Sequence, residues 1–316
     1  MNQAFVPRPP AGTFDFHTHT CRSDGAPDQT PRTVCRLAKE QAGLTHLAIT
    51  DHDWMLERAE REALAEEFDL DLIAACEFSA ELILDGRRHI VHIGGHWLDE
   101  GDPALQAVIR YNQAQNYEGY VKEMLRQCLR YGLDPSGEGV ERSYQMILDR
   151  NPQSHHLGKQ AVCALLCETG CAASPEEARK KYLSAQGERL AYVPSEAFFH
   201  FAPLEMVLDA IHRSGLSTLN HLYYYRLERA EEDALVALFR QMGGHALETY
   251  YPGYSGAPRA RLETFCKAFS LLPNSGSDRH RADQPFRPGP PWLFEALHER
   301  CRTIHGRICG GWDQLG

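Results

Sequence analysis

The sequence predicts an α/β fold in which a largely parallel sheet approaches a closed barrel and carries an inserted helical subdomain. Short apolar runs typical of strands alternate with helical patterns before residue 98 and again after residue 197, and this alternation predicts parallel strands joined by right-handed crossovers. Roughly seven strand–helix units can be counted, which is close to the number that closes a barrel. Residues 99–196 show only helical patterns, which indicates an insertion.

Local signals define where these elements begin and end. Thr30 and Pro31 provide the N-cap and the first-turn proline of a helix that Gly43 ends. Asp85-Gly86, between two apolar runs, is typical of a two-residue hairpin turn. In the first barrel part, residues 13–98, the predicted elements are strands at 13–16, 45–50 and 71–76, helices at 30–41 and 55–67, and a hairpin at 81–93. In the second part, residues 197–316, they are helices at 203–213, 228–241, 258–268 and 292–301, and strands at 217–220, 245–249 and ending at 274–276.

Composition limits the classes of partner. The net charge is −10 with His neutral and the two signs are mixed along the chain, which argues against a broad nucleic-acid or membrane surface. A small anionic substrate remains compatible, because a local metal cluster outweighs a distant negative surface. Residues 1–13 lack the basic start and apolar core of a signal peptide, so we expect a cytoplasmic protein whose ten cysteines are reduced.

Polar clusters follow the predicted strands. Because the carboxyl ends of the strands converge on one face of a barrel-like fold, side chains some 260 positions apart are expected to meet there. The clusters are His17-Thr18-His19 with Asp24, Asp51-His52-Asp53, Glu77, His221, and Asp278-Arg279-His280.

Each cluster alone has an ordinary explanation. A His-x-His pair arises by chance, Asp53 is a fair helix cap, and Glu77 is compatible with a solvated strand end. Together these explanations fail, since unpaired acids and imidazoles rarely end so many strands unless a cation satisfies them. Mixed His and carboxylate ligands favour Mn²⁺, Zn²⁺ or Fe²⁺, and the number of candidates implies two or three ions. Such a cluster activates a bridging water as hydroxide, so the predicted chemistry is hydrolysis.

The same residues resemble the motifs of the polymerase and histidinol phosphatase (PHP) family. The first motif is similar to Asp15-Phe16-His17-Thr18-His19 with Ser23-Asp24-Gly25, and the second to Ile49-Thr50-Asp51-His52-Asp53. The later motifs resemble Cys76-Glu77-Phe78-Ser79, Val91-His92-Ile93-Gly94-Gly95 and Gly276-Ser277-Asp278-Arg279-His280. The matches follow the family order along nearly the whole chain.

The resemblance implies a distorted (β/α)₇ TIM-like barrel with a helical cap and a trinuclear metal site. It assigns His17, His19, Glu77 and Asp278 to one metal, and Asp24, His52 and His280 to a second. A third would be held by Glu77, His92 and a histidine of the insertion, for which His156 is preferred over His155 because His156-Leu157-Gly158-Lys159 resembles a family segment. His221 corresponds to a histidine that lies near the metal or the substrate.

The expected reaction is hydrolysis of a small phosphomonoester, such as a nucleoside 3′,5′-bisphosphate or the end of a short oligonucleotide, by a hydroxide that bridges two metals. Lys159, Arg226 and Arg279 are candidates for binding the phosphate, and Asp24, His52 or His221 for handling the leaving-group proton. The segment from Tyr223 to Tyr225 departs from the family pattern. It either lines the pocket mouth or packs in the core.

Two alternatives remain open. One is histidinol phosphate phosphatase, although the strict members of that group lack so clear an insertion. The other is a non-catalytic metal-binding PHP module, which predicts missing ligands or an attached partner domain. A phosphate-release screen across nucleotides, sugar phosphates and histidinol phosphate discriminates among the three. The sequence does not determine the oligomeric state.

Overall fold

The computed structural model describes residues 13–185 and 191–306, so nearly all of the N-terminal stretch considered above lies outside the described residues. The first sheet is entirely parallel, with strand order β1 (Phe14–Thr18), β2 (His46–Ile49) and β3 (Asp71–Ile73). Helices α1 (Pro31–Ala42) and α2 (Arg58–Phe68) connect these strands. As predicted, the Thr30 side chain caps α1, and Gly43 ends it with φ +60°.

The second sheet has the order β4 (Ala75–Leu84), β5 (Arg87–His96), β6 (Leu216–Leu219), β7 (Ala246–Tyr250) and β8 (Leu272–Ser275). The predicted hairpin is confirmed: β4 and β5 are antiparallel, and both turn residues Asp85 and Gly86 have positive φ. β5 is also antiparallel to β6, whereas β6, β7 and β8 are parallel. The predicted strand at 71–76 is split after Ile73, so Glu77 lies inside β4 rather than after a strand end.

The two sheets meet at both edges through isolated bridges. Thr18 of β1 pairs with Arg279, which follows β8, and Phe14 pairs with Gly289. On the other side His52, which follows β2, pairs with Glu77 of β4. These bridges bring the segments after β1, β2 and β8 together with the beginning of β4, and the polar clusters gather there.

Helices cover the outside of the strands and bury their apolar faces. The connecting helices on this side are α3 (Pro103–Gln113), α8 (Leu204–His212), α9 (Arg229–Gln241), α10 (Ala257–Phe269) and α11 (Pro291–His305). α8, α9 and α10 pack on β4–β7 in one large core that includes Phe78, Phe239 and Leu262. α11 packs Phe294 against Phe14 and Trp97 in another. Truncating such a buried Phe to Ala costs about 3–5 kcal/mol, so these cores fix the strand ends relative to one another.

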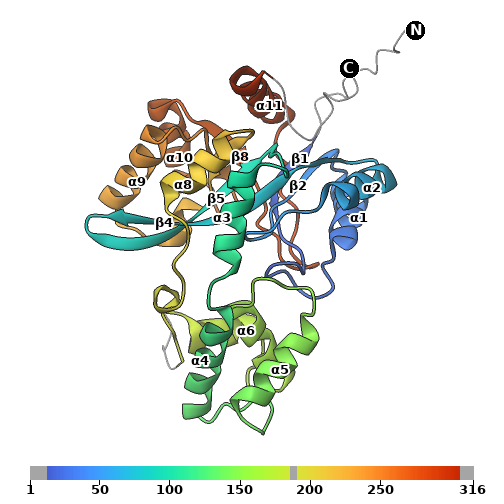
Figure 1. Cartoon of the computed structure of the whole chain (residues 1–316), viewed down its shortest axis with the longest axis vertical. Coiled ribbons are helices and arrows are strands. Elements are labelled where there is room, and N and C mark those ends of the chain that lie inside the picture. Colours follow the sequence, from blue (N-terminus) through green and yellow to red (C-terminus); the bar gives the residue numbers. More distant parts are fainter. Residues whose placement is uncertain (1–12, 186–190, 307–316) are drawn as a thin grey trace.

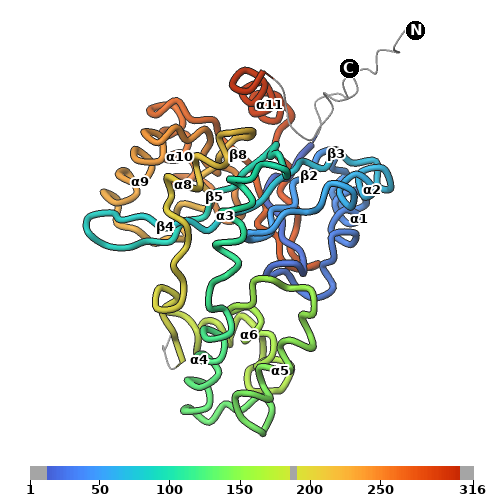
Figure 2. The backbone as a smooth tube through the Cα atoms, in the orientation of Figure 1, coloured from blue at the N-terminus to red at the C-terminus, as the bar shows by residue number. Residues whose placement is uncertain are grey.

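A separate helical lobe lies below the strands, as Figures 1 and 2 show. It has its own core, built on Val121, Met124, Val162 and Leu166. We call this lobe, the described part of residues 117–201, the cap. It contains α4 (Tyr117–Arg130), α5 (Val140–Arg150), α6 (Lys159–Glu168), α7 (Pro175–Ala178), the π-helix η1 (Arg179–Leu183) and the 3₁₀ helix η2 (Ser195–Ala197).

The boundary of the insertion differs from the predicted residue 99. α3 packs against α8, and its Leu105, Val108 and Ile109 belong to the core of the sheet rather than to that of the cap. The chain therefore leaves the strand-bearing part only after α3, because the apolar side of this helix is already buried there. Within the described ranges, no helix is both long enough and apolar enough to cross a membrane.

Candidate metal centre

The first group of polar side chains surrounds the end of β1. His17 and His19 alternate along an extended segment and are almost fully buried, with their Nε2 atoms 3.1 Å apart. The Glu77 carboxylate lies between them, with Oε1 3.2 Å from His17 Nε2 and Oε2 3.4 Å from His19 Nε2. Asp278 Oδ1 lies 3.1 Å from His19 Nε2. Four side chains, two from strands and two from the segments that follow β1 and β8, therefore meet in one small volume.

The second group joins the loops after β1, β2 and β8. Asp24 Oδ1 lies 3.1 Å from His280 Nε2 and 3.8 Å from His52 Nε2. The His19 and His280 rings stack with their centres 4.3 Å apart. His19, Asp24, His52 and His280 each offer an atom within 4.8 Å of the others, as a metal-binding group requires.

The third group connects the sheet to the cap. His52 Nδ1 lies 3.3 Å from Glu77 Oε2, and His92 Nδ1 lies 3.7 Å from Glu77 Oε1. The His156 ring stacks on His52 at 4.5 Å between centres, so it completes this side of the cluster. His155 instead lies parallel to Trp54 at 6.3 Å. The structure thus places the preferred His156 beside the cluster and its rival away from it.

Several buried atoms of the cluster have no aligned hydrogen bond. They are His52 Nδ1, Glu77 Oε2, His92 Nδ1 and His156 Nδ1. Buried polar atoms without partners are costly, and a set of imidazole nitrogens and carboxylate oxygens is what borderline divalent cations prefer. The residues present therefore fit a divalent metal centre.

The charges of Glu77 and His92 agree with this assignment. Burial alone would raise the pKa of Glu77, but His17, His52 and His92 outweigh it and hold that pKa well below its usual range. Burial lowers the pKa of His92 to about 4, which keeps the imidazole neutral near pH 7. An ionised carboxylate beside a neutral imidazole is the protonation state that metal ligation requires. Against the effect of burial, nearby carboxylates raise the pKa of His17, and Asp24 and Asp278 raise that of His280 to about 10, so a cation bound there would displace a proton from each.

Both aspartates that flank His52 serve as supports rather than ligands. Asp51 is fully buried and accepts hydrogen bonds from Thr20 N at 2.7 Å and Thr20 Oγ1 at 2.6 Å, which fixes the loop that carries Asp24. Asp53 does not cap a helix; it accepts from Ser79 N at 3.1 Å and Asn112 Nδ2 at 2.7 Å. These bonds fasten the His52 loop to β4 and to α3.

His221 lies at the edge of the cluster in a strained conformation. Its Nε2 is 3.1 Å from Glu77 Oε1, and its φ of +27° is unusual for a residue with a side chain. Tyr224, in the 3₁₀ helix η3 (Leu222–Tyr225), is half exposed, and both it and Tyr225 line the cavity described below. Tyr223 turns away and donates to Pro258 O at 2.9 Å. The segment therefore divides between the two predicted locations.

Sequence reasoning missed three residues of the site, two that support the cluster and one that lines the cavity described below. Glu248 of β7 is 1% exposed and accepts from His17 Nδ1 at 2.8 Å. The Tyr251 hydroxyl donates to Asp278 Oδ2 at 2.7 Å. Arg179 of η1 lines the cavity. A charged residue inside the apolar run of β7 was a usable signal for Glu248, whereas nothing local distinguishes Arg179 from the two lysines that follow it.

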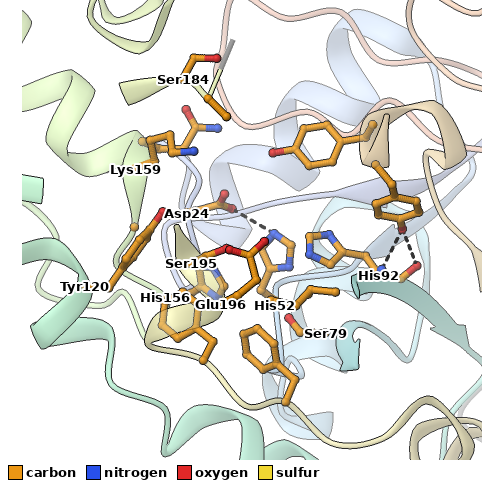
Figure 3. Close-up of a pocket in the computed structure, with 18 of the residues that line it drawn as sticks. Asp24, His52, Ser79, His92, Tyr120, His156, Lys159, Ser184, Ser195 and Glu196 are labelled. Atoms are coloured by element: carbon orange, nitrogen blue, oxygen red, sulfur yellow. Dashed lines mark hydrogen bonds and ion pairs between the residues drawn. The ribbon is translucent and has the colours of Figure 1, made fainter. Parts of the chain in front are cut away.

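A cavity of about 420 Å³ lies between the strand ends and the cap. Asp24, His52 and His92 line it from the strand side, and Tyr120 and Lys159 face them from the cap (Figure 3). Arg226 also lines the cavity, as predicted. The cluster is thus open to this cavity on the side that the cap covers.

The assignment of Arg279 to phosphate binding does not hold in this structure. Arg279 is fully buried, and its guanidinium donates to Gln29 Oε1 at 2.7 Å and to Gln284 O at 3.0 Å. The group also stacks over the Phe286 ring at 4.7 Å. Arg279 therefore fastens the loop after β8 and does not reach the cavity.

Comparison with known proteins agrees with the site. The chain is 29% identical over 283 residues to the 5′-3′ exoribonuclease Rnm of Salmonella typhimurium, covering 89% of this chain and 87% of the relative. It is 25% identical over 268 residues to a 3′,5′-nucleoside bisphosphate phosphatase of Chromobacterium violaceum, covering 84% and 87%. A solved metal-dependent phosphoesterase from Bifidobacterium adolescentis aligns with a TM-score of 0.72 and 24% identity over 95% of this chain and 100% of the other. No known protein-family profile matches the chain.

The fold and the buried His, Asp and Glu cluster define a metal-dependent hydrolase of the α/β class. With the relatives above, the cluster supports a phosphoesterase as the more particular class. Its motifs resemble those of the PHP family.

Proposed function

We propose that the protein hydrolyses a phosphate ester of a nucleotide, either a nucleoside 3′,5′-bisphosphate or the phosphorylated end of a short oligonucleotide. The observation that carries this proposal is a cavity lined by part of the metal-ligating cluster and by three cationic side chains that have no carboxylate partner among the described residues. The names of the two curated relatives, an exoribonuclease and a nucleoside bisphosphate phosphatase, support the same substrate class.

The cationic side chains are Lys159 of α6, Arg179 of η1 and Arg226 after η3. Among the described residues, no carboxylate lies within ion-pair distance of any of the three, although Glu196 also lines the cavity. Burial and the nearby charges of Arg179 and Arg226 lower the pKa of Lys159. Three like charges without a counter-ion in the part of the chain that the structure describes favour an anionic ligand, and guanidinium groups suit phosphate.

The aromatic lining of the cavity suits a nucleoside. Tyr120, Phe199 and Tyr224 are among the residues that line it. Aromatic rings in a cavity stack against bases at about 1–3 kcal/mol per base. A substrate with one phosphate at the metal cluster, a base on the aromatic wall and a second phosphate at the cations would fill the cavity.

The metal centre itself is part of the proposal. We assign His17, His19, Glu77 and Asp278 to one ion, Asp24, His52 and His280 to a second, and Glu77, His92 and His156 to a third, with Mn²⁺, Zn²⁺ or Fe²⁺ as candidates. A divalent cation bound there would acidify a coordinated water and neutralise charge on the phosphoryl oxygens. The two sheets and their edge bridges support a distorted (β/α)₇ barrel below the helical cap as the scaffold.

Among the three candidates for moving the leaving-group proton, exposure favours Asp24. Its side chain is 14% exposed and lines the cavity, whereas the side chains of His52 and His221 are 7% and 4% exposed. His221 does not line the cavity, and its contact with Glu77 Oε1 gives it a supporting position. We therefore propose that Asp24 relays this proton. Against the effect of burial, His280 and His52 hold the pKa of Asp24 well below its usual range, so its carboxylate would accept a proton from the attacking water and pass it to the leaving group.

The test is a phosphate-release screen with protein loaded with Mn²⁺. The substrates are nucleoside 3′,5′-bisphosphates, nucleoside monophosphates, 5′-phosphorylated oligonucleotides, sugar phosphates and histidinol phosphate. We expect the highest kcat/KM for a nucleotide with two phosphate groups. A preference for histidinol phosphate would select that alternative. Turnover of no substrate by metal-replete protein would reject the enzyme assignment in favour of a non-catalytic metal-binding module.

A further inference from the structure

Glu248 is a buried carboxylate that touches the metal cluster without belonging to it. It lies inside β7, where it is 1% exposed. Both of its oxygens have partners: Oε1 accepts from His17 Nδ1 at 2.8 Å, and Oε2 accepts from the backbone N–H of His221 at 2.7 Å. No Lys or Arg of the described ranges lies within ion-pair distance of it; its one ion-pair partner there is His17. A buried carboxylate placed in this way is costly unless its position serves the site.

We infer that Glu248 is a positioning residue that sets which nitrogen of His17 binds the metal. Because Oε1 accepts a hydrogen bond from Nδ1, that nitrogen carries a proton and Nε2 presents its lone pair. His17 Nε2 faces the cluster, 3.2 Å from Glu77 Oε1 and 3.5 Å from Asp278 Oδ1. A carboxylate behind a ligating histidine fixes the tautomer and the ring plane and makes the imidazole a better ligand.

The second oxygen of Glu248 couples this histidine to another element of the site. His221 follows β6, and its backbone has a φ of +27°, which is strained for a non-glycine residue. The hydrogen bond to Oε2 holds that backbone in place. One carboxylate thus fixes both the end of β1 and the turn after β6. A neutral amide cannot replace it, because two N–H groups, those of His17 Nδ1 and of the His221 backbone, need an acceptor, and an amide side chain offers one acceptor and one donor.

The surrounding backbone leaves room for this contact at Gly276. A Cβ at this position would lie 2.2 Å from His17 Cβ and 2.6 Å from Glu248 Oε1. Gly276 directly follows β8 and precedes the ligand Asp278 by two residues. The absence of a side chain there lets the end of β8 approach His17 and Glu248 closely, which is a second and independent sign that the pair is built into the site.

The proposal rests on the metal site of the proposed function, but its test measures metal binding and not turnover. Zn²⁺ affinity of the full chain is measured by competition with a chromophoric chelator for wild type, Glu248→Gln and Glu248→Ala. Glu231→Gln is the matched control, because Glu231 is also a buried glutamate that accepts from a backbone N–H, in α9 and outside the cluster. We expect both Glu248 variants to bind Zn²⁺ about 10–100-fold more weakly and the control to match wild type.

A spectroscopic readout separates positioning from general destabilisation. In ¹⁵N-histidine spectra of the Zn²⁺-loaded wild type, His17 should ligate through Nε2 and keep a proton on Nδ1 that exchanges slowly with solvent. In Glu248→Gln, which preserves volume, that proton should exchange faster. Wild-type Zn²⁺ affinity in Glu248→Gln, or ligation of wild-type His17 through Nδ1, would overturn the inference. If Glu248→Ala fails to fold, these two measurements still decide, and absence of phosphatase activity in wild type would reject only the proposed function.

Discussion

Removing the positive charge of Arg179 should selectively impair the use of substrates with two phosphate groups. Arg179 begins η1, lines the cavity on its cap side, and has no carboxylate partner among the described residues. In Arg179→Ala the metal cluster keeps all its ligands, since none of them contacts this side chain. The loss should therefore fall on the second phosphate and not on the reacting one.

The magnitude follows from the chemistry of the contact. A hydrogen bond to a charged group contributes about 1.5–3 kcal/mol, which corresponds to roughly 10–150-fold in kcat/KM. Arg179 is exposed and shares the anion with Lys159 and Arg226, so the lower end of about tenfold is expected. Because the contact is made equally in the ground state and the transition state, KM should rise while kcat changes little.

The assay compares kcat and KM for a nucleoside 3′,5′-bisphosphate with those for the two corresponding monophosphates, at fixed Mn²⁺. Lys180→Ala is the matched control, because Lys180 is the next residue, is exposed and carries the same charge, but does not line the cavity. An equal loss for the bisphosphate and the monophosphates, or an equal loss in the control, would refute a second anion subsite at Arg179.

Three other predictions concern the metal centre, its support and the opposite end of the strands. Asp278→Ala should lower bound metal, measured by elemental analysis, and abolish phosphate release; unchanged stoichiometry and rate would remove Asp278 from the site. Asn112→Ala should lower the free energy of unfolding, measured in urea, by about 3–5 kcal/mol. Asn112 is fully buried and forms hydrogen bonds with Asp53 Oδ1, Ser79 O and Ala202 N, and each buried group that loses its partner costs about 1–3 kcal/mol. A loss below ~1 kcal/mol would contradict this. Burial lowers the pKa of His212 in the folded protein to about 4, below the value of about 6.5 for an unperturbed histidine. Between these two pH values the unfolded chain binds a proton on His212 that the folded protein does not. The free energy of unfolding should therefore fall by ~3 kcal/mol as the pH drops through that window. His212→Gln should flatten that part of the pH–stability curve relative to wild type, and identical curves would exclude the effect.

Much of the fold was readable from the sequence because its signals are local. Thr30, Pro31 and Gly43 delimit α1 through capping and backbone preferences that act within one turn. Asp85-Gly86 fixes the hairpin because few residues tolerate two successive positive φ angles. The ligand candidates His17, His19, Asp24, His52, Glu77, Asp278 and His280 were identifiable for a similar reason, since such residue types rarely gather at the predicted ends of buried strands without a cation. His92 was identifiable only through the resemblance to the PHP motifs.

What the tertiary structure decided depends on groups distant in sequence. Arg279 sits beside two ligands, yet Gln29 and Phe286 hold its guanidinium in the interior, and only the folded chain brings those partners to it. His155 and His156 are neighbours with the same chemistry. The packing of the cap against the site places the ring of His155 beside Trp54 and the ring of His156 on His52. The start of the cap after α3 was likewise set by packing against α8.

The sequence by itself therefore determined the class of fold and the chemistry at its centre, because strand and helix periods, turn residues and ligand types are properties of short segments. Only the tertiary structure decided which cations reach the cavity and which carboxylate stands behind His17. Lys159, Arg179 and Arg226 come from three separate elements, and Glu248 lies 231 residues from His17. Contacts between such groups depend on how strands and cap are packed, and that packing is set by the whole core and not by any local pattern.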